Sequence, residues 1–98
     1  MIKTHKIKID EEFADAVLCG DKNFEIRKND RGYQKGDHVI FDVVDISVDI
    51  SIYGTTHLDH PLNDLEFEIT YVLNGWHVEQ DYVVFGIKRL SRTRQNYE

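Results

Sequence analysis

The sequence predicts an α+β domain that is mostly β, with five to six mainly antiparallel strands and one short helix, residues 11–19. Several short runs alternate apolar and polar residues with period two, the pattern of strands that have one buried and one wet face. Turn signals separate these runs, as at Asn29–Gly32 and Asn74–Gly75. Only residues 54–64, which contain the single proline, form a long connection. Short turns between alternating strands predict a small β-barrel or curled sheet.

The helix is predicted by its ends and by one apolar stripe. Asp10 is a good N-cap, and Gly20 is a natural residue to follow the last helical turn. Phe13, Ala16 and Val17 fall at helical spacing on one face. A helix this short is not stable alone, so we expect that face to dock on the sheet.

Alternation assigns a face to each strand residue. The strands are expected at residues 5–9, 23–28, 39–43, 46–53, 65–73 and 82–87. In the second strand Phe24 and Ile26 are predicted to face the core, with Glu25 and Arg27 on the outer face. In strand 65–73 the odd-numbered residues, Tyr71 included, are predicted to point inward. His5 shares its face with apolar neighbours, so we expect a buried and hydrogen-bonded histidine.

The bulk properties predict one cytoplasmic domain, residues 1–88, followed by a basic and flexible tail, 89–98. The chain has 98 residues, 41% hydrophobic and 31% charged, which is ordinary for a globular protein. It shows neither a signal peptide nor an apolar run of membrane-spanning length. The single Cys19 rules out an internal disulfide and fits a reducing compartment. A monomer is favoured.

The charges are divided along the chain. The net charge is −6, yet all twelve Lys and Arg lie in residues 1–35 or 88–94, while residues 36–87 hold ten Asp or Glu. If the first and last segments meet, one face is basic and attracts polyanions in spite of the net charge. Equally, the division could be a chance feature of an acidic protein, or the acidic 36–87 face could bind a basic partner protein.

Residues 20–37 carry the densest cluster of polar donors and acceptors. Within ten positions this segment combines only two strong apolar residues with the following charged and polar ones: Lys22, Glu25, Arg27, Lys28, Asn29, Asp30 and Arg31. The cluster is either a solvated hairpin with weak surface ion pairs or a polar site held on a rigid strand. Asn29 and Asp30 also suit a turn, since both side chains bond their own backbone there.

The run Gly20-Asp21-Lys22-Asn23-Phe24-Glu25-Ile26-Arg27-Lys28-Asn29-Asp30-Arg31, followed by Gly36-Asp37, resembles the ASCH domain of the PUA-like superfamily. It is most similar to the bacterial and phage ASCH-like group that is still a domain of unknown function. The likeness extends over residues 5–88. It implies a PUA-like β-barrel with a cleft between barrel and helix, and binding of RNA or a modified nucleoside.

The resemblance also raises an amidohydrolase that acts on an acylated nucleoside such as acetylcytidine. Some small ASCH proteins use a Lys at the position of Lys22, a Thr nucleophile at the position of Glu25 and a distal Glu. Here the Thr is replaced by Glu25, and Glu79 lies in a loop comparable to that of the distal Glu. Glu25 would then act as general base on a water, with Lys22 polarising a carbonyl.

The candidate ligand-binding residues follow from charge and shape. Lys8, Lys22, Arg27 and Arg31 would supply cationic contacts, Glu25 and Asn29 would read polar edges, and Trp76 is either a base-stacking residue or a cap on the core. The run Thr-His-Leu-Asp-His at 56–60 contains zinc-type ligands, which His77 could join, but it lacks a fixed period. We therefore expect no metal there and no cofactor.

Overall fold

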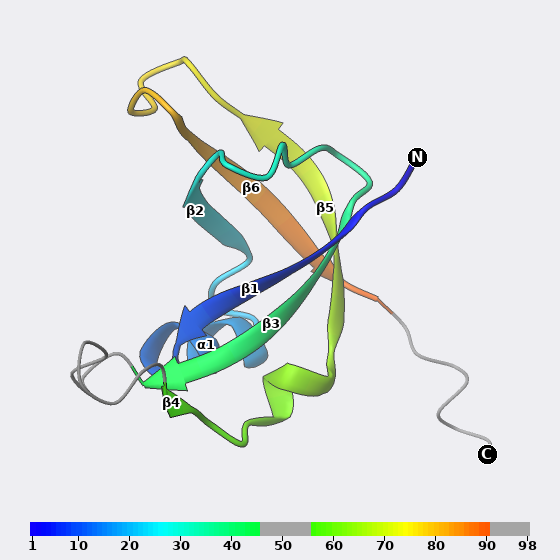
Figure 1. The fold of residues 1–98 in the computed structure, drawn as a ribbon, viewed down its shortest axis with the longest axis vertical. Helices are drawn as coiled ribbons and strands as arrows, with labels where there is room; N and C mark the ends of the chain where they lie inside the picture. The colour runs from blue at the N-terminus through cyan, green and yellow to red at the C-terminus, as the bar shows by residue number, and fades with distance from the viewer. Residues whose placement is uncertain (46–55, 91–98) are drawn as a thin grey trace.

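One curled six-stranded sheet with a helix at one end makes up the described part of the chain, residues 1–45 and 56–90 of a computed structural model (Figure 1). The elements in chain order are β1 (Thr4–Asp10), α1 (Glu11–Leu18), β2 (Phe24–Lys28), β3 (His38–Asp45), β4 (Thr56–His57), the 3₁₀ helix η1 (Pro61–Asp64), β5 (Glu66–Leu73) and β6 (Tyr82–Arg89). The predicted mostly-β class is confirmed. The strand expected at 46–53 and most of the expected tail, 91–98, lie outside the described residues.

The strand order leaves β1 and β2 as the two edges of the sheet. The order is β1-β3-β5-β6-β2, with β4 beside β3. The β1–β3 pair is parallel, and every other pair is antiparallel. The sheet curls so far that a side chain on β2 reaches β1: Arg27 Nη2 donates to Lys8 O at 2.6 Å. We call the gap between these edge strands the seam.

The core fills the concave side of the sheet. It contains alternate residues of β1, β3, β5 and β6 and the buried side of α1; the fully buried members include Val39, Phe41, Ile69, Val83 and Phe85. Alternation predicts these inward faces correctly wherever a strand is regular and lies inside the sheet. Tyr33 packs at the edge of this core with its ring centroid 4.7 Å from that of Phe85.

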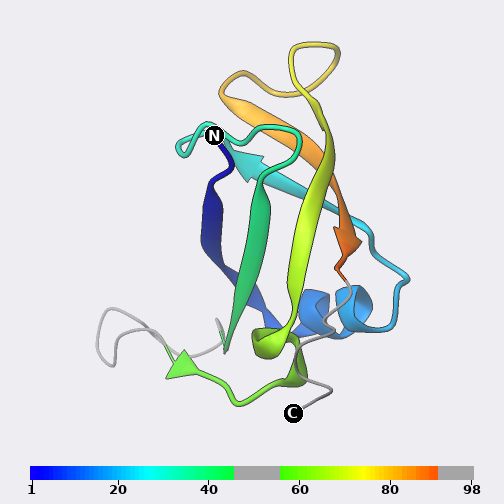
Figure 2. The same ribbon diagram turned by 90° about the vertical axis from the view of Figure 1, so that its right-hand side faces the viewer.

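Helix α1 closes the end of the curled sheet where β1 finishes (Figure 2). The Asp10 carboxylate accepts from Glu12 N at 3.3 Å, and Gly20 follows the helix with φ +89°, as the sequence predicts. The predicted stripe is wrong at Phe13, which is 49% exposed, because Ala14 and Val17 make the buried contacts instead. Neither helix of the described segments is long and apolar enough to pass through a membrane.

Strand β2 presents the opposite face to the one predicted. Phe24 and Ile26 are 41% and 58% exposed, whereas Glu25 is 3% exposed. The cause is the register with β6, because directly opposed residues in an antiparallel pair share a face. Glu25 lies opposite the buried Phe85, and Phe24 lies opposite Gly86. Glu25 and Arg27 therefore point inward, and the apolar residues point out.

A β-bulge makes the predicted face of β5 wrong after Ile69. The ladder with β6 shifts between Ile69 and Tyr71, so the alternation changes phase there. Ile69 is buried as expected, Tyr71 is 64% exposed, and Val72 packs on the core in its place.

Candidate functional site

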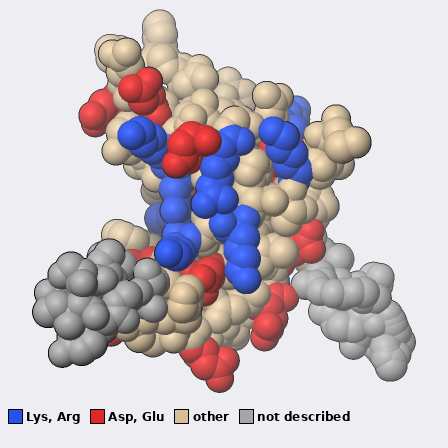
Figure 3. Space-filling view, viewed as in Figure 1, with Lys and Arg blue, Asp and Glu red and all other residues tan. Residues whose placement is uncertain are grey.

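A basic pocket of about 530 Å³ opens at the seam. Its lining is Lys6, Ile7 and Lys8 from β1, Arg27 and Lys28 from β2, Asp30, Arg31 and Tyr33 from the following segment, and Asp42 from β3. Five of these nine side chains are cationic and two are acidic. Figure 3 shows the basic atoms gathered in columns over this face of the molecule. The pocket is therefore a positively biased hollow in an acidic protein.

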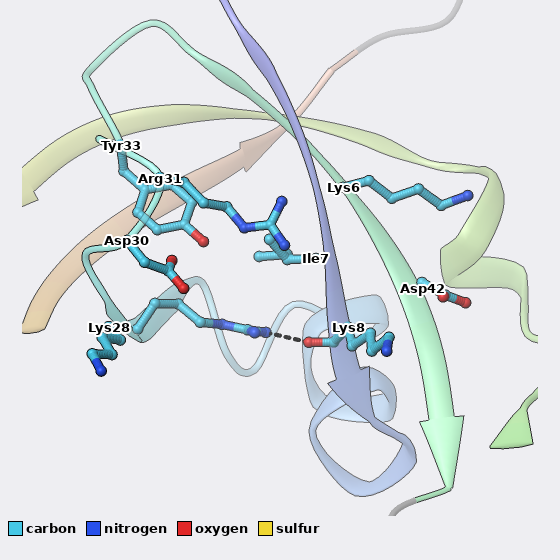
Figure 4. Close-up of a pocket in the computed structure, with 9 residues that line it drawn as sticks. Lys6, Ile7, Lys8, Lys28, Asp30, Arg31, Tyr33 and Asp42 are labelled. Carbon is cyan, nitrogen blue, oxygen red and sulfur yellow. Dashed lines mark hydrogen bonds between the residues drawn. The ribbon is translucent and has the colours of Figure 1, made fainter. Parts of the chain in front are cut away.

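The cations reach this hollow from two sides. Arg31 extends from the segment after β2 toward β1, while Lys6 and Lys8 extend from β1 over the side of Asp42 (Figure 4). Asp42 lies opposite Lys8 in the β1–β3 ladder and pairs with His57 at 2.8 Å. A ligand with several anionic groups, spaced along a chain, fits this distribution better than a single small anion.

The Glu25 carboxylate is buried between two cations. Lys22 Nζ contacts Glu25 Oε2, and Arg27 Nε donates to Glu25 Oε1 at 3.1 Å. Lys22 Nζ also donates to Phe24 O at 2.8 Å. The side chains of Lys22 and Arg27 are only 18% and 24% exposed. This charge network fixes Arg27 so that its outer nitrogen reaches across the seam to β1.

A second pocket of about 520 Å³ lies on the other side of the Arg27–Lys8 bridge. We call it the aromatic pocket; its lining is Lys8, Ile9, Asp10, Phe13, Lys22, Phe24, Glu25, Ile26 and Arg27. The Lys22 ammonium lies 5.7 Å from the Phe13 ring centroid and 5.1 Å from that of Phe24. The two pockets share Lys8 and Arg27, so they adjoin at the seam, and we refer to the two together as the hollow.

A buried pair holds the segment that carries Arg31 and Tyr33. His5 Nε2 bonds Asp37 Oδ2 at 2.8 Å, and the same carboxylate accepts from Lys3 N and Gln34 N. Burial alone would raise the pKa of Asp37, but these hydrogen bonds outweigh it and hold the pKa below its usual range. The expected buried and satisfied role of His5 is confirmed.

Tyr33 sits where the core meets the basic pocket. Burial raises the pKa of its phenol, and the nearby Arg31 and Arg27 offset part of that rise. The ring also packs 4.7 Å from His5, centroid to centroid. Tyr33 therefore forms a buried, neutral wall beside the basic side chains of the pocket.

The structure separates two predicted site residues from this hollow. Asn29 serves the turn: its Oδ1 accepts from Tyr33 N at 3.3 Å, and the residue lines a different cavity, beside Asp81. Trp76 is 77% exposed in the turn between β5 and β6 and lines neither seam pocket. Of the C-terminal basic cluster, Arg89 lines a cavity with Lys22, while residues 92 and 94 fall outside the described segments.

The histidines of the 56–60 run have structural partners. His60 Nε2 bonds Asp15 Oδ1 at 2.7 Å and its Nδ1 accepts from Leu62 N, which ties η1 to α1. Across residues 1–45 and 56–90, no three His, Cys, Asp or Glu side chains gather as metal ligands would. The residues of the predicted acidic face are also divided, since Asp37 is buried and Asp42 lines the basic pocket.

Sequence reasoning missed Lys6, Lys28 and the exposed Phe13 and Phe24 as parts of the hollow. Lys6 had no motif to distinguish it from other surface charges, and Lys28 was named only as a member of the polar cluster. The signal for Phe24 was the pattern Lys22-x-x-Glu25-x-Arg27, because a carboxylate with cations on both sides in sequence can be buried on a strand. With Glu25 assigned to the buried face, alternation would have predicted an exposed Phe24.

The fold and the hollow define a small curled-sheet protein with a basic seam between its edge strands. Residues 4–87 match the family model described as "Domain of unknown function (DUF3850)", so the chain belongs to that family. It is also similar to a protein of Escherichia phage P2 described as "Uncharacterized 12.9 kDa protein in GpA 3'region". The two are 45% identical over 40 residues, which is 41% of this chain and 37% of the phage protein.

Proposed function

We propose that this chain is an ASCH-like, PUA-like protein that binds RNA or a modified nucleoside along the seam. The observation that carries the proposal is the charge of the basic pocket, five cations to two carboxylates, in a chain of net charge −6. Such local concentration of one sign raises the association rate and affinity of a polyanion. The ASCH-like motif of residues 20–37 supports the same role.

Arg27 is the central binding residue of the proposed site. Glu25 and Lys8 O each engage one guanidinium nitrogen, and the group has further donors for a phosphate oxygen or a base edge. Because both contacts fix the plane of the guanidinium, little side-chain entropy remains to be lost on binding. In this scheme Glu25 positions Arg27 and does not read the ligand directly.

The test uses a fluorescein-labelled single-stranded RNA of ten nucleotides and mixed sequence. We expect the affinity to fall steeply with salt, and Arg31→Gln to reduce the slope of log K against log salt by about 0.7. Lys35→Gln is the matched control, since Lys35 is exposed and does not line the basic pocket. Equal affinities and slopes for wild type and Arg31→Gln would contradict the proposal.

A hydrolase is the second candidate, because Lys22 and Glu25 touch each other in a pocket large enough for a nucleoside. The geometry is unfavourable for a general base, since Glu25 is 3% exposed and each of its carboxylate oxygens already has a cationic partner, which leaves little room for a water beside it. The enzyme predicts release of acetate from acetylcytidine that is lost in Lys22→Ala. No turnover across a panel of acylated nucleosides would end this alternative.

A further inference from the structure

The aromatic pocket displays an unusual amount of apolar surface. Phe13, Phe24 and Ile26 are 49%, 41% and 58% exposed, and all three line this one pocket. Single exposed apolar residues need no explanation, but a cluster at a concave site marks a surface that another molecule covers. Two of the three are aromatic rings.

The position of the aromatic pocket indicates that its ligand has an anionic group next to the apolar group. The aromatic pocket and the basic pocket meet at Lys8 and Arg27, which line both. A ligand group in the aromatic pocket is therefore next to a region that attracts phosphate. An unpaired nucleotide has this combination, because its base is flat and largely apolar on its faces and its phosphate is only a sugar away.

We infer that the aromatic pocket takes one unpaired base of a single-stranded RNA whose adjoining phosphate lies in the basic pocket. The inference rests on the proposed function and extends it by excluding paired RNA. In a duplex the faces of each base are covered by its neighbours, so Phe24 and Phe13 have nothing to stack on. The stacking role that the sequence offered to Trp76 passes to Phe24, with Phe13 beside it.

The first experiment compares two exposed aromatic residues on strands. Phe24→Ala removes a ring of the aromatic pocket, and Tyr71→Ala removes a ring that lines neither seam pocket. Fluorescence anisotropy measures binding of the labelled ten-nucleotide RNA, alone and annealed to its complement. Phe24→Ala is expected to weaken single-strand binding between about fivefold and a hundredfold, and Tyr71→Ala to leave it unchanged.

A second measurement reports stacking directly. Phe24→Trp in a Trp76→Phe background leaves one indole, at the proposed stacking position. The single strand is expected to quench its fluorescence, whereas inorganic polyphosphate is expected to bind without quenching. This readout also covers the case in which Phe24→Ala perturbs the fold, which circular dichroism would detect.

The outcomes separate the inference from the proposal beneath it. If Arg31→Gln weakens binding but Phe24→Ala binds like wild type and the indole is not quenched, the base site is wrong and the basic pocket stands. Duplex binding as tight as single-strand binding also overturns the base site. If Arg31→Gln has no effect, the proposed function fails, and the inference fails with it.

Discussion

Glu25 shows how a charged side chain comes to lie on the buried face of an edge strand. Glu25 is 3% exposed, and each of its carboxylate oxygens has a cationic partner. Burying a carboxylate without such partners would be prohibitive, and removing one partner would leave a buried charge uncompensated. Lys22 and Arg27 therefore have a structural role that cannot be separated from any binding role by deleting them. For that reason the exposed Arg31 is the better probe of function.

Asp37 is the residue whose charge should control stability in acid. Its folded pKa lies below the ordinary value of 3.8, so the unfolded chain binds the proton more readily. Stability from this carboxylate is therefore present above pH 3.8 and is lost as the pH falls through the folded value. Asp37→Asn should lower the free energy of unfolding by roughly 1–3 kcal/mol at pH 7.

Urea unfolding of wild type and Asp37→Asn at several pH values measures this effect. The difference between the two proteins should shrink as the pH falls below 3.8, because the unfolded wild-type chain takes up a proton there before the folded protein does. Asp59→Asn, at an exposed position just before η1, provides a control carboxylate. A difference that stays constant from pH 7 to pH 3 would show that the Asp37 charge is not the cause.

The strands differ in how well alternation predicts their buried faces. Strands β1 and β3 and the regular parts of β5 and β6 follow the apolar period, because an uninterrupted ladder holds alternate residues of each strand toward the core. Strand β2 has one neighbour only, and its register with β6 decides its face. Hydrophobicity alone does not reveal that register, so it assigned Phe24 and Ile26 to the wrong side.

The bulge in β5 was hidden for a related reason. Thr70 looks like an ordinary outward residue, and the change of phase after it depends on how β5 meets β6. The candidate site was predictable to the extent that it follows residue chemistry: Lys8, Lys22, Arg27 and Arg31 do meet at the seam. Lys6, Phe13 and Asp42 also line these pockets, and to predict that would have required knowing how the whole sheet curls.

Gly86 is the residue that the bulge makes sensitive. A Cβ at this position would lie 2.7 Å from Thr70 Oγ1, which is closer than such atoms approach. Gly86→Ala is expected to destabilise the fold by about 1–3 kcal/mol, measured by urea unfolding. In the double variant Gly86→Ala/Thr70→Ala the contact is gone, so the two effects should fall clearly short of additivity. Strict additivity would mean that the two positions do not touch.

At the scale of the whole molecule, the seam is the reason that this curled sheet is not a closed barrel. β1 and β2 are not paired with each other, and the Arg27–Lys8 hydrogen bond spans the gap between them. A lysine at position 27 keeps the charge but cannot bind Glu25 and Lys8 O in the same fork-like manner. Arg27→Lys should therefore destabilise by about 1 kcal/mol and lower Tm by roughly 4–8 °C.

Lys28→Arg is the matched control for that substitution, because Lys28 is an exposed neighbour on the same strand. Thermal unfolding by circular dichroism compares the three proteins. A melting temperature of Arg27→Lys equal to that of wild type would show that the bridge contributes nothing to holding the edges together.

The open seam also determines how a long polymer could reach the pockets. A closed ring must be threaded from an end, whereas a lengthwise opening admits a polymer broadside, at any point along its contour. The Arg27–Lys8 bridge is a side-chain contact, so its opening leaves every backbone ladder intact. If the proposed function holds, interior stretches of a transcript and circular strands would load as readily as free termini.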